Sequence, residues 1–326
     1  MDELRITDIS WRGRPAWLLA APGLEVVVTR CGAQLACIRH PGEEANALWQ
    51  PPWPAAAPEA ADPGIHGDDG AAGLLANIVG HNPCIDRFGA PHPGEDKPPH
   101  GEAGVLDWTP SCEATALELG LSLPVAGLHL TRRHEISGQE LQVSTRIRHD
   151  EATPRAIEWA EHVTLGPPFI DAATIEAPVD GAWLWDGEPQ ATWRFQSQDA
   201  DLAVDPAAAL ALPRPDDPPA GDIITTRLSA GSFTATDHQQ GHQLTYTWDA
   251  AVFPWLCLWT QHRSRQAPPW NGQTRTRGLE FATKPFPDGL PPPERARSWQ
   301  GRPTTCLVPP GEGLSTCFTV RWTRSL

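Results

Sequence analysis

Residues 117–147 read LELGLSLPVAGLHLTRRHEISGQELQVSTRI, and a leucine stands at every second position from 117 to 123. Such alternation places every second side chain on one face of a β-strand. A turn-forming segment, Pro124 to Gly127, follows these leucines, and alternation returns at 128 and, after Ser137-Gly138, at 141. The stretch therefore predicts three consecutive antiparallel strands joined by tight turns.

The same two-residue period recurs along the chain, whereas a helical period is hard to find. The 36 prolines and 28 glycines agree with this pattern, since both residues are costly inside helices and common in turns. The sequence predicts an all-β protein built from antiparallel sheets. Further strands are expected at 24–29, 35–38, 244–248, 256–260, 278–281 and 318–322.

Two segments interrupt the strand pattern, at 50–72 and 203–222, and both are rich in Pro, Ala and Asp. Each could be a linker between domains. Strand-like sequence of the same character lies on both sides of each segment, so we interpret them as long surface loops. The expected organisation is a single domain over residues 1–326.

The formal net charge of −15 excludes some classes of partner. An acidic surface repels phosphate backbones and anionic membranes, which argues against nucleic-acid binding and membrane association. No run of 18 apolar residues is present, and the first residues, MDELR, lack the features of a secretory signal. We therefore expect a cytoplasmic protein. Seven cysteines without a CxxC pair argue against a disulfide framework or a zinc knuckle.

A first cluster of polar residues combines HNPCIDRFG at 81–89 with PPHGEAG at 98–104. A loop rich in Pro and Gly could direct the imidazole of His100 at a ligand, and Arg87 could offer several donors to hydroxyl groups. The alternative is that Asp86 and Arg87 form a surface ion pair and that the loop histidines have no role in binding.

A second cluster is IEWAEHVTLGPPF at 157–169. Alternation places Trp159 and Glu161 on one face and Glu158 and His162 on the other. Because histidine titrates near neutral pH, His162 is a candidate general acid. A structural histidine is the alternative.

The third cluster is RGLEFATKPFP at 277–287, in which Glu280 stands between two large apolar residues. Alternation projects Glu280 opposite those neighbours, and a carboxylate beside an apolar wall suits a general base. An exposed glutamate on a strand is the alternative. The nearby Trp255, Trp259 and Trp270 could stack on a sugar's apolar face, although tryptophans in strands more often pack in a core.

Taken in order, the three clusters resemble the aldose 1-epimerase (galactose mutarotase) family. The matching motifs are His100-Gly101, the segment from Trp159 to His162, and Leu279-Glu280, with Arg87 similar to the family's substrate-contacting arginine. The likeness extends loosely over nearly the whole chain. It implies a β-supersandwich of antiparallel sheets with long loops and a sugar bound in an open cleft.

The resemblance also implies a mechanism. Glu280 would remove the anomeric hydroxyl proton while His162 protonates the ring oxygen, so that the ring opens, rotates and closes again as the other anomer. His100 would form a hydrogen bond near the ring oxygen, and Arg87 would orient the hydroxyl groups. Apart from the resemblance, the chemistry of their side chains makes Trp255 and Trp259 candidates for binding the sugar. No metal or organic cofactor is expected, and the partner would be a monosaccharide or related sugar bound by a monomer or dimer.

Departures from the family pattern keep other functions open. Glu102-Ala103 follow His100-Gly101 in place of the usual Phe, and Val163-Thr164 follow His162 in place of Pro-Tyr. The main alternative is a non-catalytic carbohydrate-binding or sensing module on the same fold. A sugar-phosphate epimerase would need a cluster of cations. A metal-dependent sugar isomerase would use His81, His92 and His100 as ligands, but these separations define no metal geometry.

Overall fold

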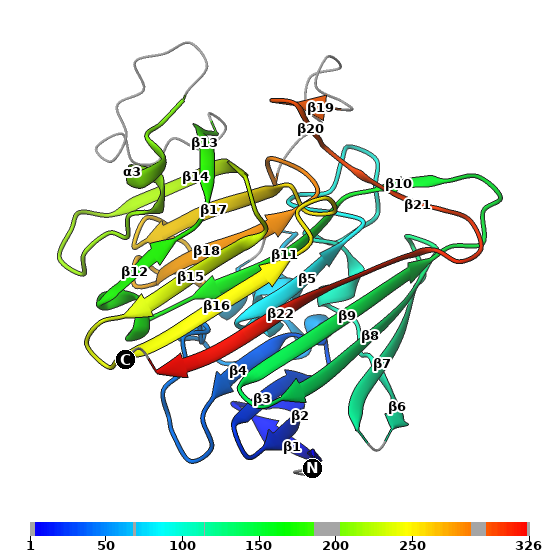
Figure 1. Ribbon diagram of the computed structural model, residues 1–326, viewed down its shortest axis with the longest axis horizontal. Coiled ribbons are helices and arrows are strands. Elements are labelled where there is room, and N and C mark those ends of the chain that lie inside the picture. The colour runs from blue at the N-terminus through cyan, green and yellow to red at the C-terminus, as the bar shows by residue number, and fades with distance from the viewer. Residues whose placement is uncertain (1–3, 68–69, 114, 186–202, 288–297, 325–326) are drawn as a thin grey trace.

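The computed structural model describes residues 4–67, 70–113, 115–185, 203–287 and 298–324. Within these residues the chain is almost entirely β, as predicted. Two large antiparallel sheets form the two layers of the structure, and short two-stranded ribbons lie at their margins (Figure 1). The ribbons pair β10 (Arg155–Ile157) with β21 (Cys306–Val308) and β19 (Ser298–Trp299) with β20 (Arg302–Pro303).

The first sheet has ten strands, and some strands that are far apart in the sequence pair with each other in it. Its order is β1 (Arg5–Trp11), β2 (Arg14–Ala21), β3 (Leu24–Thr29), β4 (Leu35–Arg39), β5 (His81–Ile85), β11 (Trp159–Leu165), β18 (Arg275–Ala282), β17 (Trp255–His262), β14 (Ala220–Leu228) and β13 (Val179–Leu184).

The second sheet has eight strands and contains the predicted meander. Its order is β12 (Ala173–Glu176), β15 (Ser232–Asp237), β16 (His242–Trp248), β22 (Leu314–Arg324), β9 (Glu140–Arg148), β8 (Leu128–Ser137), β7 (Ala116–Leu123) and β6 (Thr109–Glu113). Because β7, β8 and β9 pair consecutively, the prediction made from residues 117–147 is confirmed.

Helices are few and short in the described residues. They are α1 (Pro63–His66), α2 (Ala72–Asn77), α3 (Pro206–Leu210), η1 (Pro58–Ala60), η2 (Glu102–Gly104) and η3 (Phe169–Asp171). None of them has the length and apolar character needed to cross a membrane. The prediction of plain surface loops at 50–72 and 203–222 is incomplete, because these segments contain short helices and the first also buries Trp53.

The main core lies between the two sheets and is built from alternate residues of each. On β18, Leu279 and Phe281 face this core, and Phe281 stacks on Trp248 of β16 with ring centroids 4.4 Å apart. The intervening Glu280 therefore projects from the outer face of the ten-stranded sheet, as alternation predicts.

A group of ionic side chains interrupts the apolar core. Arg132 on β8 donates to both carboxylate oxygens of Glu161 on β11, at 2.7 and 2.9 Å. His81 on β5 contacts the same carboxylate at 2.7 Å, and all three side chains are fully buried. This ion pair therefore joins the two sheets across the core.

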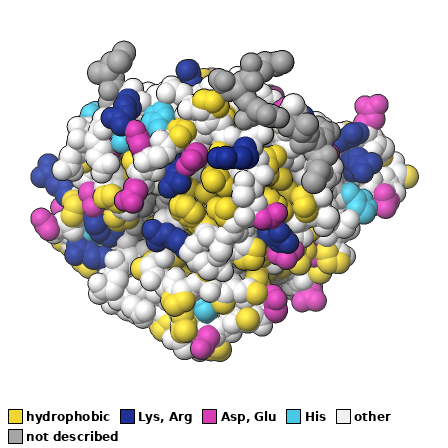
Figure 2. All heavy atoms as spheres, turned by 90° about the horizontal axis from the view of Figure 1, so that it is seen from below, with side chains coloured by type: hydrophobic (Ala, Val, Ile, Leu, Met, Phe, Trp, Pro, Cys, Tyr) yellow, Lys and Arg dark blue, Asp and Glu magenta, His cyan; other side chains and the backbone are white. Residues whose placement is uncertain are grey.

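Charges of both signs occur on the face seen in Figure 2. Hydrophobic side chains gather near its centre, with Lys, Arg, Asp and Glu side chains placed around them. The net negative charge is thus not a uniform acidic coat on this side of the molecule.

Candidate functional site

Four residues from four neighbouring strands form a row on the outer face of the ten-stranded sheet. His162 lies directly opposite Asn82 of β5 and Glu280 of β18, and Glu280 lies opposite Cys257 of β17. Directly opposed residues of antiparallel strands project to the same face. Strand pairing therefore brings the second and third sequence clusters together.

His162 and Glu280 are in contact. His162 Nε2 lies 3.1 Å from Glu280 Oε1, and His162 Nδ1 lies 3.1 Å from the hydroxyl of Thr164, two residues further along β11. Only 5% of His162 and 2% of Glu280 is exposed. The two candidate proton-transfer groups thus form a buried pair, and the hydroxyl fixes the imidazole plane.

The environment of His162 favours release of a proton. Burial, and after it the neighbouring His100, lowers the pKa of His162 well below its ordinary value. An imidazolium formed here would be a stronger acid than one in water. This shift suits a group that gives a proton to a weakly basic oxygen.

Gly278 provides the room that the carboxylate of Glu280 occupies. These two residues share one face of β18, and a Cβ atom at 278 would lie 2.4 Å from Glu280 Oε1 and 3.0 Å from the Cβ of Trp259. Any side chain at 278 would therefore displace the carboxylate or the indole.

His100 reaches the pair from the loop that joins β5 to η2. Its φ angle of +64° is unusual for a residue with a side chain, and the turn is closed by a hydrogen bond from the Gly101 N–H to the Pro98 carbonyl. The rings of His100 and His162 meet edge to face, with centroids 5.1 Å apart. All three predicted catalytic residues therefore converge.

The tautomer of His100 follows from its backbone contacts. The Gly89 N–H donates to His100 Nδ1 at 3.4 Å, so Nδ1 acts as the acceptor in the neutral ring. The hydrogen then resides on Nε2, which can donate to a ligand.

Trp259 lies beside the pair. Its ring centroid is 5.9 Å from that of His162, and the guanidinium of Arg265 lies 5.5 Å from its centroid. Trp270 packs in a cluster with Trp49 and Trp53, and these contacts cover the faces of its ring. Among the three tryptophans singled out in the sequence, Trp259 has the placement that suits contact with a ligand.

Arg87 and Trp255 are placed differently from the other predicted site residues. Trp255 has no exposed surface; it packs on Trp299 with centroids 5.2 Å apart and donates its indole hydrogen to the Pro303 carbonyl. The Arg87 guanidinium donates to the carboxylates of Glu158 and Glu95. The structure thus gives Trp255 a packing role and Arg87 an ionic one.

The three histidines of the alternative metal site lie on different parts of the structure. No group of three or more His, Cys, Asp and Glu side chains there is arranged to hold an ion. His81, one ligand of the alternative metal site, lies in the core against Glu161, on the opposite face of the sheet from His162. The three-histidine metal site is therefore wrong.

Comparisons with known proteins identify similar folds. No family model matches the chain, and no curated protein does. A solved structure from Klebsiella pneumoniae, described provisionally as an aldose 1-epimerase, matches with a TM-score of 0.67 and 13% identity, over 96% of this chain and 80% of its own. The chain has the galactose mutarotase-like fold.

Two further mutarotase-like structures agree. A galactose mutarotase related enzyme from Lactobacillus acidophilus matches with a TM-score of 0.62 and 12% identity, over 95% of this chain and 98% of its own. A galactose mutarotase-like protein from Lactobacillus casei matches with a TM-score of 0.59 and 12% identity, over 94% and 100%. At such low identity a shared fold does not establish a shared activity, which depends on the residues of the site.

Sequence reasoning missed two residues of this site. Thr164 holds Nδ1 of His162, and Asn82 stands next to His162 with a buried Oδ1 that has no hydrogen-bond partner among the described residues. Alternation from His162 would have indicated Thr164. Asn82 could not be found in this way, because the pairing of β5 with β11 is not a local property of either strand.

Proposed function

We propose that this protein is an aldose 1-epimerase that interconverts the anomers of a monosaccharide or related sugar. The observation that carries the proposal is the buried contact of His162 with Glu280, with His100 at its edge. Ring opening of a cyclic hemiacetal needs one base and one acid that can contact the same monosaccharide. A sugar would enter between the two side chains and replace their mutual contact.

The proposed reaction conserves protons. The carboxylate of Glu280 takes the anomeric hydroxyl proton while protonated His162 gives its Nε2 proton to the ring oxygen, and the bond between C1 and that oxygen breaks. Rotation about C1–C2 exposes the other face of the aldehyde, and both transfers then run backwards. The pair must therefore hold one proton at the start. Because burial lowers the pKa of His162, the carboxylate of Glu280 and the bound sugar would have to stabilise the imidazolium.

His100 and Trp259 would act on the bound sugar without exchanging protons with it. The Nε2–H of His100 would donate a hydrogen bond near the ring oxygen, where charge changes during opening. Trp259 would offer an apolar surface to the C–H face of the sugar. Arg87 is left out of sugar binding in this proposal, because carboxylates of the protein occupy its guanidinium.

The test is the rate at which a freshly dissolved pure anomer equilibrates. With a panel of aldoses, the protein should accelerate equilibration of at least one sugar well above the spontaneous rate, as followed by polarimetry or NMR exchange. Binding of a sugar without acceleration of any in the panel would support the carbohydrate-binding module and reject the enzyme.

Chelation provides an independent expectation. Because the proposed transfers use only side chains, EDTA treatment should leave the rate of anomer exchange unchanged. Assays before and after chelation, and after adding back divalent ions, would measure this. Loss of activity that a divalent ion restores would contradict the proposed chemistry.

A further inference from the structure

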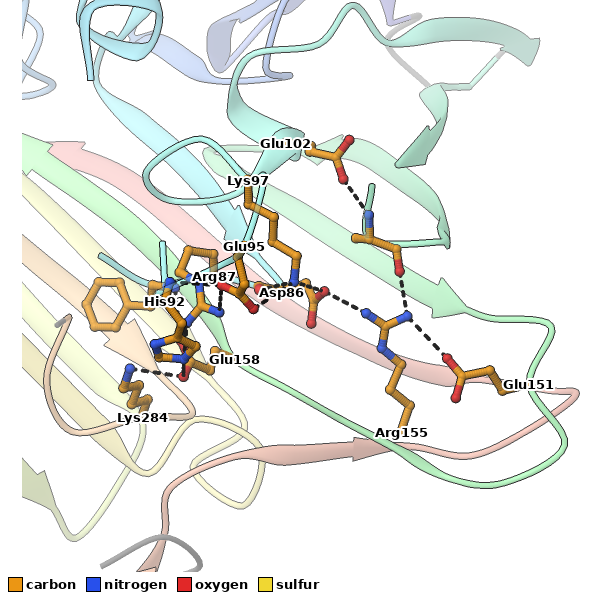
Figure 3. A network of polar contacts seen from close by, with 12 residues as sticks. Asp86, Arg87, His92, Glu95, Lys97, Glu102, Glu151, Arg155, Glu158 and Lys284 are labelled. Carbon is orange, nitrogen blue, oxygen red and sulfur yellow. Dashed lines mark hydrogen bonds and ion pairs between the residues drawn. The ribbon is translucent and has the colours of Figure 1, made fainter. Parts of the chain in front are cut away.

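The loop that carries His100 is held down by ionic contacts (Figure 3). Near its start, Arg87 donates to Glu158 at 2.9 Å and to Glu95 on the same loop. Near its end, Lys97 donates to Asp86 at 2.7 Å. These contacts join the two sides of the loop to each other and to the sheet.

Glu158 ties together segments that adjoin three strands of the site. It immediately precedes β11, Arg87 follows β5 and Lys284 follows β18. Glu158 Oε2 accepts from Arg87 and from the Phe88 N–H at 3.3 Å, whereas Oε1 accepts from Lys284 at 2.9 Å. Glu158, Arg87 and Lys284 are all buried.

A short path leads from Glu158 to His100. Phe88 and Gly89 follow Arg87 directly in the chain, and the Phe88 ring centroid is 6.0 Å from that of His100. Gly89 holds His100 twice, because its N–H donates to His100 Nδ1 and its carbonyl accepts the His100 N–H at 2.8 Å. The position of the imidazole therefore depends on where residues 87–89 are anchored.

The energetics of such an anchor favour a geometric role. Removing two charges from water costs about as much as their attraction returns, so a buried ion pair adds little net stability. It does restrict the geometry of the groups that it joins, because removing Glu158 would take a carboxylate away from two buried cations, Arg87 and Lys284.

We propose that Glu158 is a positioning residue, which holds Arg87 and Lys284 and thereby places His100 over the His162–Glu280 pair. The inference rests on the proposed epimerase function for its kinetic consequence. It also reassigns Arg87, which the sequence pattern indicated as a sugar ligand, to the support of the loop.

The kinetic test is a double-mutant cycle. Glu158→Gln keeps the shape of the side chain and removes its charge, and it should lower kcat about 10-fold with little change in KM, because a displaced catalytic group loses transition-state contacts. In a His100→Ala background the same substitution should have no further effect. Glu25→Gln is the matched control: it removes a partly buried ion pair with Arg39, on β3 and β4 of the same sheet, and should leave kcat unchanged.

Two kinetic outcomes would overturn the inference. An equal loss from Glu158→Gln in both backgrounds would show a general structural effect. A raised KM with normal kcat would show that the ionic group contacts the sugar itself. If Glu158→Gln does not fold, Arg87→Lys replaces it, since lysine keeps the charge but cannot bridge Glu158 and Glu95 with a planar fork; the same outcomes then apply.

A second readout does not depend on activity. The imidazole NMR signals of His100, assigned by comparison with His100→Ala, should move in Glu158→Gln and stay in place in Glu25→Gln. Unchanged His100 signals in Glu158→Gln would refute the positioning role. If the wild-type protein accelerates no anomer exchange, the proposed function fails while this measurement still decides the role of Glu158.

Discussion

Glu280→Gln should lower kcat for anomer exchange by about 10²-fold or more, with sugar affinity near that of the wild type. Glutamine is nearly the same shape and fits the space above Gly278, but it cannot accept the anomeric proton at neutral pH. A loss confined to kcat would place the missing interaction in the transition state. The measurement is anomer exchange by NMR over a range of sugar concentrations, with affinity determined separately by calorimetry.

Glu140→Gln is a suitable control for this variant. Glu140 also lies on a strand, but its side chain is 41% exposed and its nearest described cation, Arg321, is 3.7 Å away. It should leave both kcat and KM unchanged. A Glu280→Gln protein that retains wild-type kcat would remove Glu280 from the role of base.

Arg132→Met should lower the free energy of unfolding by about 3–5 kcal/mol, because it leaves Glu161 buried without its main counter-charge. The expected loss would appear in urea denaturation at neutral pH. Arg321→Met removes an exposed arginine and should cost less than about 1 kcal/mol. Combining Arg132→Met with Glu161→Leu should recover part of the loss, since the unpaired carboxylate is then gone. A single-variant loss as small as that of the control would contradict the expectation.

The same pair has a pH signature. Burial raises the pKa of Glu161, but Arg132 and His81 more than offset burial and lower it to about 2. A carboxylate with a depressed pKa in the folded state contributes stability at neutral pH, and this contribution is lost as the pH falls from about 4.5 toward 2. As the pH falls across that interval, the free energy of unfolding should therefore decrease less in Arg132→Met than in the wild type.

The strands were predictable because alternation is a local property. The repeated leucines at 117–123 and the run around Glu280 indicated both the strand and the outward direction of the carboxylate. The convergence of His100, His162 and Glu280 came from the family resemblance, since no local pattern fixes which strands become neighbours.

The environment of each side chain could not be predicted from the sequence. Arg87 has the chemistry of a sugar ligand, but Glu158, which occupies it, lies 71 positions away in the chain. Trp255 alternates toward the same face as Trp259, and only the packing of Trp299 on it distinguishes the two. Such contacts depend on long-range pairing, which also explains why Asn82 was missed.

The order of strands in the ten-stranded sheet also bears on how the protein folds. The row of Asn82, His162 and Glu280 joins three strands whose connecting segments contain most of the other sheet. Contacts between residues so far apart in sequence require large loops to close first, which makes folding of such β topologies slow. During synthesis the row cannot form until β18 has left the ribosome. Until then β11 would lack a neighbour on one side and expose a strand edge, which is the feature by which unfinished β proteins associate with one another.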